Sequence, residues 1–187
     1  MRSIFAIEMC LQLDADLQRQ LSRAVTENSL RMTYGDKWQR YCFASNLLLQ
    51  NAPLWHRGCW DFFDDSDRAE KDFHMWVQGM LTREGARTEP SGSADPYRRE
   101  PRYLTFTMAA VLVGGSDCHN AIQALCKMPE DVLWQRSTFA RILNGVRNLN
   151  FASVVKDTMY LIPGDLGWGL TAADLSHEKF AYLRTIV

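Results

Sequence analysis

The spacing of apolar residues predicts a strand at the start of the chain and two helices after it. Between residues 4 and 13 the odd positions are all apolar, whereas polar residues such as Glu8 interrupt the even ones. This two-residue period is typical of a strand. Over residues 14–28 and again over 35–51, apolar residues recur at three- and four-residue steps, which predicts two amphipathic helices, the second closed by Pro53.

The next stretch is expected to contain a short strand, a third helix and a long loop. Residues 54–63 are rich in aromatic side chains, as in a strand or an extended segment at a sheet edge. Asp65 or Ser66 can cap a helix that reaches Leu81. Residues 83–101 have no apolar period and contain several prolines and glycines, which predicts a flexible loop.

The second half of the chain begins with its clearest strand. Both alternating faces of residues 103–113 are mostly apolar, which is typical of a central strand. Two helices are expected at 116–126 and 129–149, followed by a strand over 151–162. Thr171 begins a capping-box pattern for a short terminal helix.

These elements predict an α+β fold in one domain covering residues 1–187. The expected order is β-α-α-β-α-β-α-α-β. The strands bury their apolar faces most economically when the helices gather on the sheet. We therefore expect a two-layer sandwich with about four strands, mainly antiparallel, and no domain linker.

Composition limits the partners and the compartment. The chain has 187 residues, with 21 Lys and Arg against 22 Asp and Glu, so no positive excess attracts nucleic acid. The longest apolar run, Met108–Val113, is far shorter than a transmembrane segment. Five cysteines without regular spacing indicate reduced thiols. A soluble, cytoplasmic protein is expected, with no cofactor; homo-oligomerisation stays open.

Aromatic and acidic residues concentrate between residues 55 and 72. Four large aromatic side chains fall in the first part of this segment, more than one sheet edge readily buries, and acidic residues follow them. Aromatic residues are enriched at protein interfaces, although core packing is the alternative. The sequence thus predicts a partner-binding surface made of Trp55, Trp60, Phe62, Phe63, Asp64, Asp65 and Asp67.

Two further functions stay open beside this non-enzymatic interaction or regulatory domain. His56, Cys59, Cys118 and His119 are residue types that bind zinc or form a Cys/His hydrolase, although no paired CxxC spacing or orienting third group accompanies them. Cys118, near a predicted helix start, would have its thiolate favoured. The acidic segment would also suit an immunity or inhibitor protein that binds a basic partner. No catalytic or metal-binding residue is assigned.

Three stretches resemble an uncharacterised family of cyanobacterial, bacterial and chloroplast proteins, known as domain of unknown function 1517. They are a leucine run leading to Trp55, similar to the family's "LALLR-hP-YW"; residues 103–115, "YLTFTMAAVLVGG", similar to "YIVVTLLVA-G"; and residues 161–183, similar to the family's closing segment. Leu161 and Ile162 stand where the family has Leu-Trp-Thr.

The resemblance implies a biological setting but no chemistry. Plant members of the family are linked to acclimation to fluctuating light, and members often carry a membrane segment before this domain. No such apolar segment is present in this sequence. The family supplies no catalytic residues to transfer to this chain.

Overall fold

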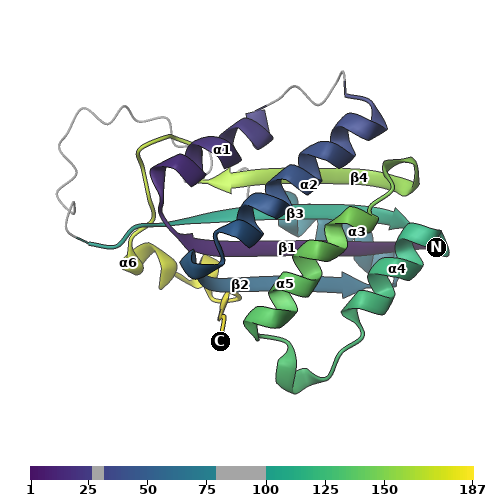
Figure 1. Ribbon diagram of the computed structural model, residues 1–187. Helices are drawn as coiled ribbons and strands as arrows, with labels where there is room; N and C mark the ends of the chain where they lie inside the picture. The colour runs from purple at the N-terminus through teal and green to yellow at the C-terminus, as the bar shows by residue number, and fades with distance from the viewer. Residues whose placement is uncertain (27–31, 79–99) are drawn as a thin grey trace.

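A five-stranded antiparallel sheet organises the chain in this computed structural model (Figure 1). The structure describes residues 1–26, 32–78 and 100–187. The strand order across the sheet is β4-β3-β1-β2-β5. The strands are β1 (Arg2–Gln12), β2 (Trp55–Phe63), β3 (Tyr103–Val113), β4 (Val154–Ile162) and β5 (Arg184–Thr185).

Helices cover both faces of this sheet. Four of them lie in front of it in Figure 1 and enclose the main core: α1 (Ala15–Thr26), α2 (Tyr34–Gln50), α4 (Asp117–Cys126) and α5 (Arg136–Gly145). α3 (Ser66–Gln78) packs on the opposite face, and the C-terminal segment with α6 (Ala172–Leu175) covers the rest of that face. Short 3₁₀ helices span Ala52–Leu54, Glu130–Val132, Val146–Asn148, Phe151–Ser153 and Glu178–Phe180.

The α+β class and the antiparallel sheet are as the sequence predicts, and so is the central position of β3. That strand pairs with β1 on one side and β4 on the other, and residues 104–112 are all buried. Its even-numbered residues face the main core, while Ala109 and Val111 pack against α3. Both sides of the strand are therefore covered, which explains why both of its faces are apolar.

Other parts of the fold prediction need correction. The sheet has five strands rather than about four, and the predicted element order is not confirmed as it stands because the chain continues through α6 to β5. A strict two-layer sandwich is also wrong, since α3 buries Phe73 against Ile4 and Ala6 on the second face. A strand with two apolar faces needs a cover on each, and α3 supplies the second.

Several predicted boundaries also shift. The single helix expected over 129–149 is instead a 3₁₀ turn, then α5, then a second 3₁₀ turn. α1 is described to Thr26 and α3 to Gln78, so the ends predicted for them at residues 28 and 81 lie outside the described residues. Most of the predicted loop 83–101 lies outside the described residues. The capping box of Thr171 with Asp174 is confirmed.

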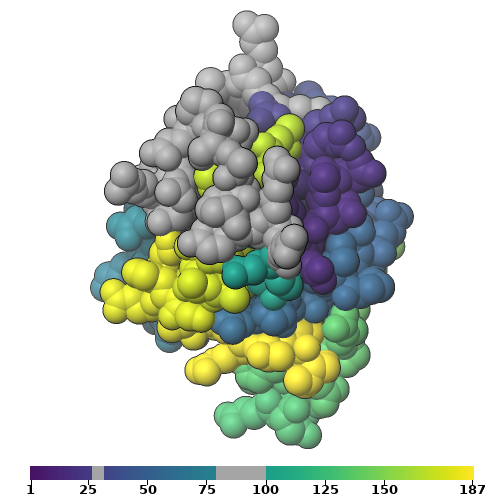
Figure 2. Space-filling view, turned by 90° about the vertical axis from the view of Figure 1, so that its left-hand side faces the viewer, coloured from purple at the N-terminus to yellow at the C-terminus, as the bar shows by residue number. Residues whose placement is uncertain are grey.

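The C-terminal residues close one end of the sheet. β5 pairs with β2 at Arg57 and Gly58. The last residue then exchanges backbone hydrogen bonds with the segment after α4: Val187 donates to the Trp134 carbonyl at 3.0 Å and accepts from Arg136. Figure 2 shows this contact from the side, with the C-terminal residues in yellow against the green segment. The chain end thus fixes the position of residues 134–136 beside β2.

Candidate functional site

The outer edge of β2 is only partly paired. β1 pairs with β2 from Trp55 to Phe63, whereas β5 covers the other side of β2 only at Arg57 and Gly58. Beyond Gly58, no described strand pairs with this outer edge. Unpaired N–H and C=O groups on a sheet edge are a template for a further strand.

The backbone groups that face outward follow from the pairing with the C-terminal segment. Ile186 donates its N–H to the His56 carbonyl at 3.2 Å, so the backbone of His56 faces β5. Backbone groups of an antiparallel strand alternate between its two neighbours. Trp60 and Phe62 therefore direct their N–H and C=O groups outward, and Cys59 and Asp61 direct theirs toward β1.

A groove of about 460 Å³ lies beside this unpaired edge. Trp60 connects the β2 side of the groove to the opposite side, because its indole Nε1 donates a hydrogen bond to the Leu133 carbonyl at 3.1 Å. The volume is in the range of ligand-binding pockets. The groove is lined by Trp60, Asp61, Phe62, Phe63 and Asp64 from the β2 side and by Gln123, Cys126, Lys127, Leu133 and Trp134 from the other.

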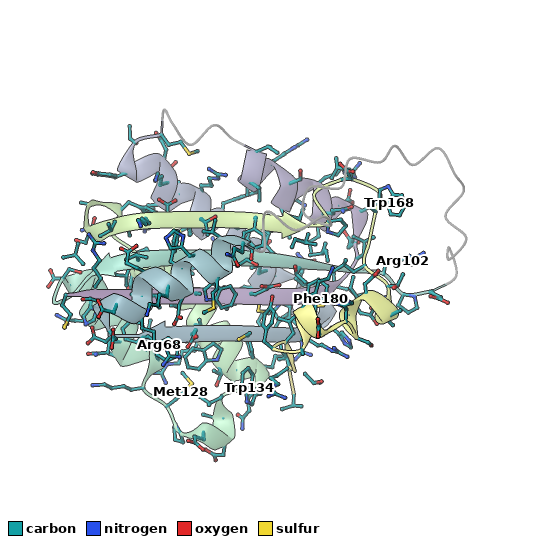
Figure 3. The ribbon with its side chains drawn as sticks, turned by 180° about the vertical axis from the view of Figure 1, so that it is seen from behind. Arg68, Arg102, Met128, Trp134, Trp168 and Phe180 are labelled. Atoms are coloured by element: carbon teal, nitrogen blue, oxygen red, sulfur yellow. The ribbon has the colours of Figure 1, made fainter. Side chains whose placement is uncertain are left out.

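The far wall comes from the segment between α4 and α5. Seen from behind, Trp134 and Met128 lie beyond β2, at the side of the sheet opposite β4 (Figure 3). The Trp134 ring packs on Phe139 of α5, with ring centroids 6.4 Å apart. Since Phe139 is fully buried, this contact anchors the wall to the main core.

The two faces of β2 differ in chemistry at this edge. Trp60 and Phe62 pack against the main core, which places their side chains on the groove face. Phe63 packs on the α3 face, and the Arg68 guanidinium lies over its ring at 3.3 Å. Asp61 also lies on the α3 face. Burial is the main cause that raises the pKa of Asp61 to about 6, and the negative charge of Asp72 adds to it. The positive charge of Arg68 and a hydrogen bond from the Phe62 N–H lower this pKa in part.

Four of the seven predicted partner-binding residues line the groove: Trp60, Phe62, Phe63 and Asp64. Trp55 does not, because only 5% of it is exposed and its Nε1 donates to the Leu48 carbonyl in the core. Asp65 instead caps α3, accepting from the Asp67 and Arg68 backbone N–H groups. Asp67 itself is exposed in the first turn of α3, outside the groove.

The rest of the acidic cluster is engaged in the fold. Asp64 accepts from Gln123 at 3.3 Å and lies 3.6 Å from His119 Nε2. Glu70 pairs with Lys156 at 2.5 Å and also with Arg2. These acidic residues therefore attach α3 and the end of β2 to neighbouring elements.

The sequence did not identify the groove residues contributed by α4 and the segment after it, namely Gln123, Cys126, Lys127, Leu133 and Trp134. Only Trp134 gave a signal. It falls outside the apolar stripe formed by Val132, Phe139 and Ile142, and a large apolar residue off the stripe indicates a contact other than helix packing.

The four candidate Cys/His residues do not form one site. His56 stacks on Tyr103, with centroids 4.8 Å apart. His119 is buried, and its Nδ1 lies 2.8 Å from the Ser3 hydroxyl. Cys118 Sγ accepts from the Asn150 N–H at 3.4 Å. Within residues 1–26, 32–78 and 100–187, no group of three His, Cys, Asp or Glu side chains is placed to hold a metal ion.

The thiols are also in environments that disfavour reaction. All five cysteines are free. Burial raises the pKa of Cys118, contrary to the thiolate stabilisation expected at a helix start, and the Asn150 N–H opposes this only in part. Burial raises the pKa of Cys59 to about 12, with Asp61 and Glu8 adding to the effect. Thiols of this kind are inert, because the thiolate is the nucleophile.

A second polar cluster, buried under the C-terminal segment, surrounds Glu8. This side chain is 1% exposed, and Tyr182 donates its hydroxyl to Oε2 at 2.9 Å. The Thr105 and Thr107 hydroxyls also face the Glu8 carboxyl and, like Tyr182, lower its pKa. Burial raises the Glu8 pKa, and Tyr182 is the largest opposing influence. Because Tyr182 covers the carboxyl, the cluster attaches the C-terminal segment to the sheet.

Comparisons with models of protein families, with curated proteins and with solved structures found no match to this chain. The resemblance to domain of unknown function 1517 therefore stays a prediction. In the part of the chain that the structure describes, no helix is long and apolar enough to cross a bilayer.

Proposed function

We propose that this chain is a non-enzymatic protein-interaction domain whose partner binds in the groove beside β2. The observation that carries this proposal is the outer edge of β2 at Trp60 and Phe62, which no described strand pairs, next to a groove of about 460 Å³. An unpaired edge contributes hydrogen bonds, and half-buried aromatic side chains contribute apolar contact area. A cytoplasmic setting belongs to the same proposal and is supported by the five free thiols.

The groove also has the composition of an interaction site. Trp60 and Trp134 stand on opposite sides of it, and tryptophan is among the residues that contribute most to binding energy at interfaces. Charged residues, Asp64 and Lys127, are exposed at its margin. An apolar centre with a charged rim is the usual arrangement of a protein interface.

Site-specific photocrosslinking in cells tests this proposal. A benzophenone amino acid replaces Lys127 in the groove or, as the control, Tyr34, which is 64% exposed at the start of α2. We expect one partner protein to crosslink from position 127 and not from position 34. Trp134→Ala should abolish this product because it removes part of one wall of the groove, whereas Met75→Ala, at an exposed position of α3, should not.

Circular dichroism and thermal unfolding confirm that each variant is folded. A partner that still crosslinks to folded Trp134→Ala, or that crosslinks equally from positions 34 and 127, would contradict the proposal. A crosslinked dimer of this chain would likewise show that the occupant is a second copy rather than a different protein.

A further inference from the structure

The unpaired edge is built to accept one strand of restricted sequence. Among the residues that the structure describes, the N–H and C=O of Trp60 and the C=O of Phe62 have no strand partner, because the alternation set by the Ile186–His56 hydrogen bond continues along β2. The Phe62 N–H lies against the carboxylate of Asp61, whose pKa it lowers. An added strand could therefore form hydrogen bonds to three backbone groups of this edge, whereas the fourth, the Phe62 N–H, already contacts the Asp61 side chain.

The side chains of such a strand would fall on two different surfaces. In antiparallel pairing, directly opposed residues have their side chains on the same face of the sheet. Residues opposite Trp60 and Phe62 would extend over the groove, whose lining also includes the apolar side chains of Leu133 and Trp134. The residue between them would lie on the α3 face, opposite Asp61.

The negative charge of Asp61 determines which side chain of an added strand is favoured opposite it. Asp72 of α3 is close enough to act on Asp61 through its charge, and Arg68 compensates for only part of that repulsion. Cys59 and Cys126, the other titratable groups near Asp61, are thiols with pKa values of about 12 and carry no charge near neutral pH. A charged side chain at a sheet edge normally hinders strand addition, so an added strand needs a positive charge here.

We propose, as an extension of the function above, that the groove receives an extended segment of another protein by strand addition to Trp60–Phe62. Apolar side chains opposite Trp60 and Phe62 enter the groove, and a lysine or arginine between them pairs with Asp61. That pairing draws the carboxylate away from the Phe62 N–H and frees it for the added strand. The recognised pattern is apolar, basic, apolar at successive positions.

Peptide selection tests the pattern. A phage library of random 12-residue peptides is selected on the full chain, with clones that also bind Trp134→Ala discarded. We expect the retained sequences to share the apolar-basic-apolar pattern. Apolar residues spaced at three and four positions would instead indicate a bound helix, and a failure to retain any clone would equally contradict strand addition.

Amide hydrogen exchange, with the best clone as a synthetic peptide, tests the binding mode. At about 90% occupancy the Trp60 amide should exchange about tenfold more slowly, since exchange proceeds from the unbound fraction. Cys59 and Asp61 are internal controls, because their amides already pair with β1. Asp61→Asn should weaken binding by about two- to fivefold, as for a partly exposed ion pair, and should not affect a peptide with glutamine in place of the basic residue.

The two proposals fail in different ways. A peptide that depends on Trp134 but leaves the Trp60 amide exchanging at its free rate would refute strand addition and leave the interaction function standing. Loss of the specific crosslink from position 127 would refute the function itself.

Discussion

At Gly58, β2 packs closely against the main core. A Cβ at this position would lie 2.6 Å from Cε1 and 3.0 Å from Cζ of Phe139, and 3.1 Å from the Glu8 carbonyl oxygen. The backbone at Gly58 is not in the left-handed region, so alanine can adopt it. The cost of Gly58→Ala is therefore steric.

The magnitude follows from the inability of Phe139 to move. Its ring is fully buried, and Trp134 packs on it. Forcing a methyl group into such a core costs about 1–3 kcal/mol. Alanine also lowers the conformational entropy of the unfolded chain, which stabilises the folded state by about 0.4–1 kcal/mol. We expect a net loss of about 1–2 kcal/mol in the free energy of unfolding, and a fall of about 2–8 °C in Tm.

Chemical denaturation of Gly58→Ala, Phe139→Leu and the double variant measures this effect. Leucine lacks the ring edge that meets the new Cβ, so the double variant should be more stable than the sum of the single losses predicts, by at least about 0.5 kcal/mol. Gly35→Ala is the control: its Cβ meets only Thr33 Oγ1, at 3.7 Å, and it should not destabilise. Additive losses, or a harmless Gly58→Ala, would refute the reasoning.

Three further predictions concern buried and capping groups. Because burial raises the Glu8 pKa, the Glu8 carboxyl stays protonated to higher pH in the folded state than in the unfolded chain. The free energy of unfolding should therefore fall as pH rises above about 4.5. Glu8→Gln, which can still accept from Tyr182, should reduce that pH dependence in denaturant titrations; an unchanged slope would show that Glu8 is not buried in its acid form. Cys118 should react with maleimide in the native protein far more slowly than in denaturant, and equal rates would contradict its burial. Thr33→Ala removes the capping box with Asp36 and should cost about 1 kcal/mol by denaturation, whereas no loss would indicate that the cap is dispensable.

The regular parts of the fold could be predicted from the sequence because each leaves a period. The alternation over residues 103–113 indicated a strand covered on both faces, and the structure places α3 on its second face. β5 could not be predicted, because two residues have no period. The start of α5 was misplaced since Pro129 and its acidic neighbours are as typical of a 3₁₀ turn as of a helix start.

The candidate site was predicted only in part, for a different reason. The aromatic residues of β2 are adjacent in sequence, but the far wall comes from Trp134 and its neighbours, which the chain brings back from α4. Trp55 and Trp60 cannot be distinguished by residue type. Their roles differ because the Trp55 indole reaches the Leu48 carbonyl in the core, whereas the Trp60 indole reaches Leu133 at the groove.

The proposed binding site exists only if the outer edge of β2 is open beyond Gly58. Residue-resolved amide hydrogen exchange of the free protein measures this. The Trp60 amide should exchange rapidly, while the amides of Cys59 and Asp61, which pair with β1, should be strongly protected. A Trp60 amide protected as strongly as its two neighbours would mean that the edge is already covered, and would contradict the proposed binding site.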